Sequence, residues 1–507
     1  MIGGKEKVLA RLLGASDPGV LFIRAWAELA KLQPADRSAV PDRVGPVARS
    51  FEDALSRTAP QDATAALESV IEAQWQAGDT LPVLVENASV LCALMNKIDR
   101  IFANVHPRTR ILSPKYAVGL DLPLWLQSAR DRRLLDGEYA RDGHYRLIPN
   151  GPFVRHAAGR DSLSGDSLQD RFPHLTVAPL TTRHEDNQIR ITIKVVGTGR
   201  ARGLPPSKSI GKEQIRFIPL AADAGDLDMC CGTRAGRATL DVRPKIDTAT
   251  RLIETLAEND PSDISFAPEL TVNTSDEERL TDAVANLLDQ APRILLAGSG
   301  LTEEKDELDR CWNEARVITK GGAILWRQRK VWPFEMHQNR AVEYGLEDPG
   351  EGGTLNEDIA GHDEITIVDL DGFGRAVILI CQDFEAQIAI DEIVRRYQPD
   401  WVFVPILDAG VNVPGWTPNR ASKLNGAQSR FLVGSSLTLS RRRGDKVAPP
   451  IGIAVGPASP TGGPPGTAHL ARALAVVDGA TVGNTISGLL VWDHRAPTWT
   501  QLNLGPA

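Results

Sequence analysis

The sequence holds little of what builds disulfide-stapled, metal-binding or membrane-spanning proteins. Among its 507 residues are only five cysteines, and their irregular spacing forms neither a disulfide framework nor a metal-ligand pattern. No apolar run approaches the roughly 20 residues that a membrane span requires, and the first residues contain no apolar core of signal-peptide length. We therefore expect a cytoplasmic protein that uses no metal or other cofactor and does not enter the membrane.

An excess of positive charge is missing as well. The chain has 57 Lys and Arg against 65 Asp and Glu, a formal net charge of −8, so we expect no nucleic-acid partner. Apolar residues make up 42% of the chain and charged residues 24%, which are the proportions of a soluble globular protein. The length exceeds what one ordinary core holds, and this predicts two or more domains.

The N-terminal part has the periodicity of helices. Over residues 5–105 apolar side chains recur at spacings of three and four, as at Phe22, Trp26 and Leu29. Alanine-rich helices with such a stripe form small bundles that pack on themselves or on a partner. We predict a mainly helical N-terminal domain over residues 1–170.

A change of pattern follows this helical part. Residues 188–196 alternate as a half-buried strand should, and residues 197–208 are rich in glycine, proline and basic side chains, as linkers are. We predict that residues 171–212 contain this strand and the linker. The second domain would then cover residues 213–507, where strands alternate with helices in the manner of an α/β layered fold.

Three apolar strands of the second part each lead to a reactive polar side chain. A short strand leads to Glu269, a second to Lys330, and the run 376–380 to Cys381. A continuous Val, Ile and Leu run indicates a strand buried on both faces of a sheet. Open α/β layers place reactive groups where such strands end, so we expect the three side chains to meet.

This set resembles the nitrilase superfamily, the carbon–nitrogen hydrolases with a Glu-Lys-Cys triad. In that family a Pro-Glu, an Arg-Lys and a Cys each follow a strand, and here these positions are Pro268-Glu269, Arg329-Lys330 and Cys381. The resemblance covers somewhat over half of the chain. It implies an α/β, four-layer αββα sandwich, preceded here by the mainly helical domain, and assembly into a homo-oligomer.

The chemistry of a cysteine nucleophile explains why the other two residues are needed. The thiolate is the attacking form, and a free thiol with a pKa near 8.5 is mostly protonated at neutral pH. The resemblance implies that Glu269 takes this proton and later gives it to the leaving group. It also implies that Lys330 and the backbone N–H of Gln382 stabilise the oxyanion, and that water hydrolyses the thioester on Cys381.

The family often has a second glutamate after the lysine, which orients substrate and water. Glu335 is the expected residue, with Glu343 as the alternative. Directly after the cysteine, Gln382 replaces the aromatic residue common in the family, and Asp383 keeps its acid. These departures leave the triad intact and indicate a divergent branch.

The predicted function is hydrolysis of a non-peptide carbon–nitrogen bond, of amide or carbamoyl type, in a small molecule. Two alternatives stay open: acyl transfer from the same thioester, and a non-catalytic scaffold in which residues 1–200 bind a protein partner. A papain-like Cys–His pair with His337 or His362 is a rival scheme, although nearness in sequence is a weak signal. Taken alone, Cys381 could also be a small buried hydrophobe, as most free cysteines are.

Overall fold

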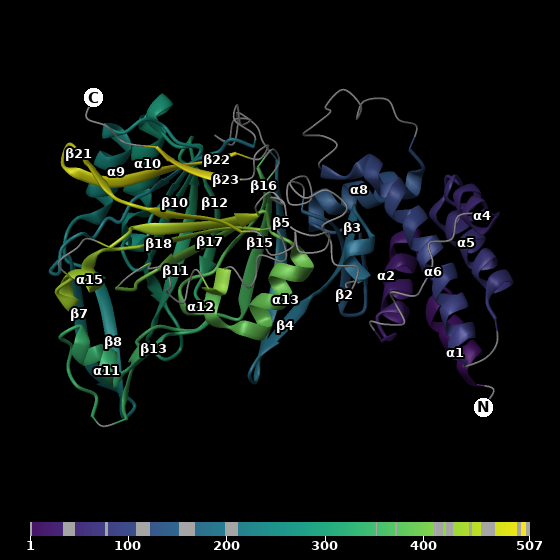
Figure 1. Ribbon diagram of the computed structural model, residues 1–507, viewed down its shortest axis with the longest axis horizontal. Helices are drawn as coiled ribbons and strands as arrows, with labels where there is room; N and C mark the ends of the chain where they lie inside the picture. The colour runs from purple at the N-terminus through teal and green to yellow at the C-terminus, as the bar shows by residue number, and fades with distance from the viewer. Residues whose placement is uncertain are drawn as a thin grey trace.

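The structure is a computed structural model, and Figure 1 shows helices at one end of an elongated molecule and large sheets at the other. The predicted linker lies outside the described residues, apart from Gly197. Among the described residues no helix combines the length and the hydropathy needed to cross a bilayer. The residues described are 3–33, 46–76, 80–107, 122–151, 168–197, 211–350, 352–370, 373–409, 411, 419–421, 429–445, 449–457, 472–493 and 498–502.

The N-terminal part is mainly helical, as predicted, with a small sheet added. Its elements are α1 (Gly3–Leu12), α2 (Pro18–Leu29), α4 (Pro46–Leu55), α5 (Pro60–Gln74), α6 (Leu81–Phe102), α8 (Leu124–Asp136), β1 (Ala140–Asp142), β2 (Tyr145–Pro149) and β3 (Leu175–Pro179). The side chain of Asp17 caps α2 by accepting the Val20 N–H at 3.0 Å. Phe22, Trp26 and Leu29 are all buried, so the predicted face of α2 packs into the core.

The first large sheet has the strand order β12-β11-β10-β9-β6-β22, with β21 and β23 both paired to β22. It provides the strands that lead to Glu269 and Lys330. Its members are β6 (Gln214–Phe217), β9 (Ile264–Phe266), β10 (Ile294–Lys305), β11 (Cys311–Thr319), β12 (Ile324–Arg329), β21 (Ala480–Val482), β22 (Thr485–Asp493) and β23 (Thr498–Leu502).

The second large sheet has the order β20-β19-β18-β17-β16-β15-β5-β4 and leads to Cys381. Its members are β4 (Thr181–His184), β5 (Asn187–Val196), β15 (Glu364–Leu370), β16 (Gly374–Ile378), β17 (Trp401–Ile406), β18 (Arg430–Ser435), β19 (Gly452–Pro457) and β20 (Arg472–Val477). The predicted strand at 188–196 is thus β5, and it pairs in parallel with β15 although it precedes the predicted linker.

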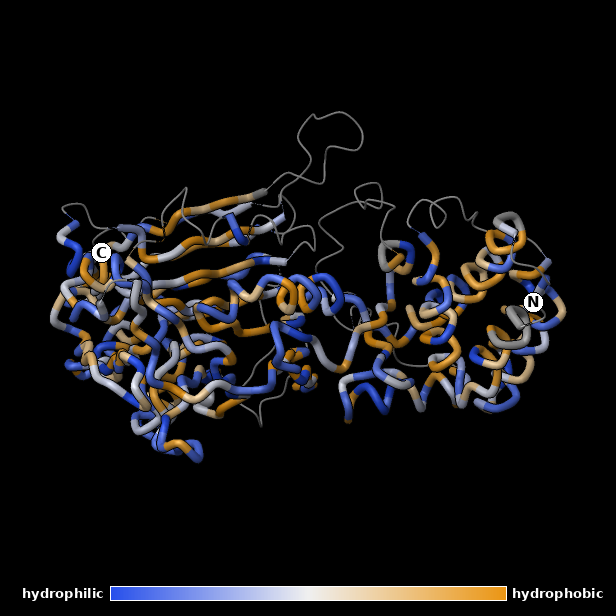
Figure 2. Tube along the Cα trace, turned by 90° about the horizontal axis from the view of Figure 1, so that it is seen from below, coloured by the Kyte–Doolittle hydropathy of each residue, from blue (hydrophilic) through white to orange (hydrophobic). Residues whose placement is uncertain are grey.

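The two large sheets pack face to face with helices outside them. The ring of Phe266 in β9 lies 5.5 Å from that of Phe217 in the same sheet and 6.1 Å from that of Phe403 in the opposite sheet. On the outer faces, α9 (Thr248–Glu258) and α10 (Glu277–Asn286) cover the first sheet, and α13 (Gln387–Tyr397) packs on the second. The predicted four-layer αββα arrangement is confirmed, and Figure 2 shows hydrophobic segments along the strands.

A third, four-stranded sheet lies beside the sandwich in the order β13-β14-β8-β7. Its strands and the nearby short helices are β7 (Leu227–Arg234), β8 (Arg237–Pro244), β13 (Glu335–His337), β14 (Thr354–Glu357), α11 (Gln338–Glu343), α12 (Gln382–Glu385) and α15 (Thr438–Arg443). Strand β14 pairs in parallel with β8, which precedes it in the chain by more than a hundred residues. This pairing places the end of β14 close to the end of β12.

Candidate active site

Glu269 lies in the turn that follows β9 and is almost completely buried, at 1% exposed. Its Oε2 atom accepts the N–H of Leu407 at 2.9 Å, directly after β17 of the opposite sheet. Its Oε1 atom accepts hydrogen bonds from Lys330 and Asn313. The Glu269 carboxylate therefore links the two large sheets, and each of its oxygens accepts at least one hydrogen bond.

A close approach of the neighbouring strand fixes the turn that carries Glu269. The N–H of Ser299 in β10 donates to the carbonyl of Pro268 at 3.1 Å. Gly298 makes this contact possible, because it has a φ of +75° and a Cβ atom there would lie 2.2 Å from the Pro268 oxygen. Leu270 on the other side of Glu269 also has a positive φ, of 54°, which is a strained conformation for a leucine.

Lys330 follows the last residue of β12 and points between two glutamates. Its Nζ atom lies 2.8 Å from Glu269 Oε1 and 2.5 Å from Glu357 Oε2. The Lys330 side chain is 1% exposed, so both contacts are shielded from water. The backbone N–H of Phe334 also donates to Glu357 Oε2, at 2.9 Å.

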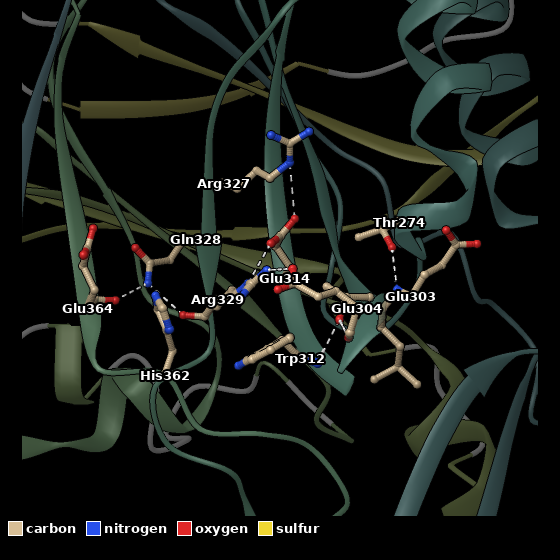
Figure 3. Close-up of polar contacts among 12 residues, drawn as sticks. Thr274, Glu303, Glu304, Trp312, Glu314, Arg327, Gln328, Arg329, His362 and Glu364 are labelled. Carbon is tan, nitrogen blue, oxygen red and sulfur yellow. Dashed lines mark hydrogen bonds and ion pairs between the residues drawn. The ribbon is translucent and has the colours of Figure 1, made fainter. Parts of the chain in front are cut away.

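Ion pairs on the outer face of the sheet anchor the end of β12, as Figure 3 shows. The guanidinium of Arg329 contacts Glu304 and lies 3.1 Å from Glu314, and it stacks over the ring of Trp312 at 4.0 Å. Arg327 contacts the same Glu314 at 3.4 Å. Because side chains alternate along a strand, these contacts on the outer face leave Lys330 directed inward.

Cys381 occupies a strained turn between β16 and α12. Its φ of 47° and ψ of −101° lie outside the regions that side-chain-bearing residues favour, which costs about 1–3 kcal/mol. Its N–H donates to the carbonyl of Pro405 at 3.0 Å. Cys381 is 8% exposed, and the charges of Glu269 and Lys330 both act on the pKa of its thiol.

Asp383 ties the turn at Cys381 to the chain that follows Lys330. Its Oδ1 atom accepts the N–H groups of Val331 at 3.0 Å and Trp332 at 2.9 Å, and its Oδ2 atom accepts that of Ile380 at 3.1 Å. Burial raises the pKa of Asp383 to about 7, although the three N–H donors act in the opposite direction. The acid retained after the cysteine thus fixes the backbone around two site residues.

The charges of the cluster shift one another's protonation. Burial, opposed by Lys330 and reinforced by Glu357, raises the pKa of Glu269. Burial disfavours the charged form of Lys330, but the attraction of Glu269 and Glu357 outweighs it and raises the pKa of Lys330 well above the usual range. Burial and the negative charge of Glu269, against the pull of Lys330, raise the pKa of the Cys381 thiol well above the ordinary value. The resting site therefore holds a charged lysine and a neutral thiol beside a carboxylate with raised basicity.

Glu335, predicted to be the second glutamate, does not join this cluster. It lies on β13 directly opposite Asn356 and is exposed, whereas the next residue, Met336, is buried. Because side chains alternate across a strand, Glu335 and Glu357 point to opposite faces of this small sheet. Glu343 lies on the exposed side of α11, 3.6 Å from Arg443.

Glu357 and Asn313 are the site residues that the sequence analysis missed. Glu357 comes 27 residues after Lys330, at the end of the short strand β14. A carboxylate at the end of a strand is the same signal that pointed to Glu269, but β14 is short and weakly apolar. Asn313 lies inside β11, where no strand-end pattern singles it out.

The two histidines of the rival Cys–His scheme lie elsewhere. His337 is exposed at the end of β13. His362 donates its backbone N–H to the Lys330 carbonyl at 3.1 Å, and its ring nitrogen lies 3.9 Å from Asp363. Within the described part of the chain, neither ring makes a hydrogen bond or an ion pair with Cys381.

Gln382 follows Cys381 as the first residue of α12. The first N–H groups of a helix have no intrahelical acceptor, which leaves the Gln382 N–H available to an oxyanion. Burial raises the pKa of Glu385, and the Gln382 side chain acts against that rise. An open cavity of about 930 Å³ begins beside these two residues, and its wall also includes His184, Ile388 and Arg420.

The donor set of the cluster suits acid–base chemistry more than metal binding. Within the described ranges, no group of three or more His, Cys, Asp and Glu side chains is arranged to hold a metal ion. Lys330 occupies the position between Glu269 and Glu357, so a cation is already provided by the chain itself.

Among known proteins, the chain has matches to solved structures only. No family model and no curated protein matches the chain. Nit3 of Saccharomyces cerevisiae, a member of branch 10 of the nitrilase superfamily, matches with 14% identity and a TM-score of 0.31 over 60% of this chain and 90% of its own. An amidase from Nesterenkonia sp. matches with 15% identity, a TM-score of 0.31 and the same coverage.

A further match is a variant of the Nesterenkonia sp. AN1 amidase that carries the acetamide moiety of fluoroacetamide on its active-site cysteine. It has 13% identity and a TM-score of 0.32 and covers 60% of this chain and 90% of its own. The four-layer fold of the present chain is established by its own sheets and core. By these comparisons the chain is similar to members of the nitrilase superfamily, the family that its three strand-end motifs resemble.

Proposed function

We propose that this protein hydrolyses a carbon–nitrogen bond of amide or carbamoyl type in a small molecule, through a thioester on Cys381. One observation carries the proposal: Glu269 and Lys330, 61 residues apart in sequence, meet at 2.8 Å in a buried cluster with the Cys381 thiol. A buried carboxylate, ammonium and thiol with raised pKa values form a combination more typical of catalysis than of structural support.

The first step is attack of Cys381 on the carbonyl carbon. The neutral thiol cannot attack efficiently, so its proton passes to Glu269 as the sulfur–carbon bond forms. The raised pKa of Glu269 suits this transfer, because a general base works best when its pKa approaches the working pH. The carbonyl π electrons move to oxygen and form a tetrahedral oxyanion.

Lys330 and the N–H of Gln382 are the proposed partners of this oxyanion. The pKa of Lys330 is raised well above the usual range, so the side chain stays charged throughout the working pH range. Fixed positive groups in a buried site stabilise developing negative charge more than water does, because they need not reorient. The oxyanion then collapses, the carbon–nitrogen bond breaks, and Glu269 returns its proton to the leaving ammonia or amine.

Water completes the cycle by hydrolysing the thioester. Glu269, now deprotonated, takes a proton from the attacking water, and the thiolate leaves and recovers that proton. Glu357 lies across Lys330 from Glu269 and is the proposed orienting glutamate in place of Glu335. The overall reaction consumes one water and releases an acid and an amine or ammonia, with no external oxidant or reductant.

The test is ammonia or amine release from a panel of small amides and carbamoyl compounds. Cys381→Ala should lower the rate on any substrate that the wild type turns over by about 10⁶-fold, the typical effect of removing a catalytic nucleophile. Cys311→Ala, which changes a half-buried cysteine outside the cluster, is the matched control and should keep the wild-type rate. Thermal melts of all three proteins show whether each is folded.

Each outcome of this test separates the proposal from its alternatives. Full activity of folded Cys381→Ala would show that the nucleophile is assigned wrongly. Loss of activity through unfolding would make Cys381 a core residue. Faster transfer to an added amine than to water would favour an acyltransferase, and a wild type inactive on the whole panel would favour the scaffold.

A further inference from the structure

We propose that Asn313 is a positioning residue that bridges Glu269 and Glu357, the two glutamates on either side of Lys330, and offsets their mutual repulsion. This inference rests on the proposed function, because its consequence is to keep Glu269 available as a base. Asn313 belongs to neither the Glu-Lys-Cys triad nor the strand ends that carry it, and its role follows from its contacts.

The side-chain amide of Asn313 bridges the two carboxylates. Its Nδ2 atom donates to Glu269 Oε1 at 3.0 Å and to Glu357 Oε1 at 3.3 Å. Ionised carboxylates only accept hydrogen bonds, so they require the nitrogen, and not the oxygen, of the amide to face them. Asn313 is 0% exposed, and this orientation is therefore not exchanged for contacts with water.

The backbone of Asn313 positions the third charged group. Its carbonyl accepts the N–H of Lys330 at 2.8 Å, because β11 and β12 pair with Glu314 opposite Arg329. Asn313 thus contacts Lys330 through its main chain and both glutamates through its side chain. A shift of β11 would move all three groups together.

The Asn313 amide has an energetic cost in the core. Within the described part of the chain its Oδ1 atom has no hydrogen-bond partner and is buried. An unpaired buried amide oxygen destabilises the fold, and an apolar side chain of similar shape avoids that penalty. The favourable contribution of the side chain therefore comes from its N–H group, which faces the two carboxylates.

The charge balance of the cluster shows what that N–H group does. Two carboxylates face one ammonium from Lys330, and the Cys381 thiol faces them from the second sheet. The remaining donors are backbone N–H groups, that of Leu407 to Glu269 and that of Phe334 to Glu357. Loss of the Asn313 donor leaves the two negative charges less compensated, and like charges in a shared site raise one pKa.

The test is the pH dependence of kcat/KM in Asn313→Leu, an apolar side chain of similar size. The acid limb reports ionisation of the free enzyme's essential base, and it should move to higher pH by roughly one unit. Asn313→Asp, which is isosteric and adds a carboxyl group, should move the limb further in the same direction. Asn356→Leu is the matched control, because Asn356 bonds to the Ala238 carbonyl and should leave the limb in place.

A second readout keeps the inference separate from the proposed function. The rate at which iodoacetamide alkylates Cys381 depends on the same base, and its pH profile should shift with that of kcat/KM. If Cys381→Ala keeps wild-type activity, the proposed function fails, while this alkylation profile still reports on Asn313. Thermal melts show whether Asn313→Leu and Asn313→Asp are folded. If both are folded and have a lower kcat/KM, but the acid limbs of their pH profiles do not move, the positioning role is overturned.

Discussion

Lys330 Nζ lies 2.8 Å from Glu269 Oε1, and the two side chains are only 1% and 2% exposed. A buried pair of this kind is stable only when further hydrogen bonds satisfy the remaining donors and acceptors. Glu357 provides a second acceptor for Lys330, and Leu407 and Asn313 provide donors for Glu269. The cluster therefore behaves as one charged unit, in which removal of a member affects the others.

Lys330→Met tests this coupling through stability. The change leaves two buried carboxylates without a cation, and we expect the free energy of unfolding to fall by about 3–5 kcal/mol. Urea denaturation at neutral pH measures the loss. The triple variant Lys330→Met, Glu269→Gln and Glu357→Gln removes the stranded charges and should recover most of it. A single variant as stable as the wild type would contradict the charged unit.

The second glutamate is tested by comparing three matched substitutions. Glu357→Gln removes a charge that contacts Lys330 at 2.5 Å, and kcat should fall by about 10²-fold or more. Glu335→Gln and Glu343→Gln change exposed residues and should keep the wild-type kcat. Steady-state kinetics on one shared substrate gives the kcat of each variant for this comparison. A larger loss for Glu335→Gln than for Glu357→Gln would restore the assignment that the sequence suggested.

The raised pKa of Asp383 leads us to predict that the free energy of unfolding depends on pH in a specific way. Its pKa is raised from 3.8 to about 7 in the folded protein, so the folded state binds this proton more tightly than the unfolded chain. The contribution of this group to stability is therefore fully present below pH 3.8 and is lost as the pH rises to about 7, by up to roughly 1.4 kcal/mol per pH unit.

Asp383→Asn removes this titration and isolates it from other groups. We measure the free energy of unfolding of both proteins by urea denaturation between pH 4 and pH 7, within the window set by the two pKa values. The difference between wild type and variant should shrink or reverse as the pH rises, because only the wild type loses the contribution. Parallel curves would show that Asp383 is ionised throughout.

The domain division remains a prediction. We propose that residues 1–170 form a mainly helical unit, and that residues 171–212, which contribute β4 and β5 to the sandwich, join it to the second domain at 213–507. Limited proteolysis of the full chain, followed by mass measurement, should find the first cuts within 197–212, where the composition is that of a linker. First cuts inside the sheets or helices on either side would contradict this division.

An ion pair connects the N-terminal helical part to the sandwich, and it should hold the two parts together after proteolytic cleavage. The Arg133 guanidinium of α8 lies 3.1 Å from Asp369 of β15, and both side chains are nearly buried. Asp369 is also paired with Arg375, 2.6 Å away, in the strand that leads toward Cys381. We therefore expect the cleaved parts to stay together at low denaturant.

Much of the fold and of the site could be predicted because long apolar runs mark strands buried on both faces. Glu269, Lys330 and Cys381 were predicted as site residues because each follows a strand, and strand ends of one layered fold lie near one another. Glu357 could not be found this way, because its place depends on the parallel pairing of β14 with β8, which are distant in sequence. No local pattern encodes that register.

Two other features could not be predicted from the sequence, each for a different physical reason. Asn313 is an interior strand residue, and only the arrival of two carboxylates from other elements gives its amide a role. The strand β5 was expected beside the linker, yet it enters the second large sheet through its pairing with β15. Half-buried alternation identifies a strand but not the sheet that accepts it.

The central claim is that the reaction passes through an acyl group carried on the enzyme. The most direct measurement uses two amides that share one acyl group but release different amines, with hydroxylamine added as a competing nucleophile. If both form the same thioester on Cys381, the ratio of hydroxamate to free acid must be identical for the two substrates. A ratio that changes with the leaving amine would mean that water and hydroxylamine attack the bound amide directly, and it would contradict the account.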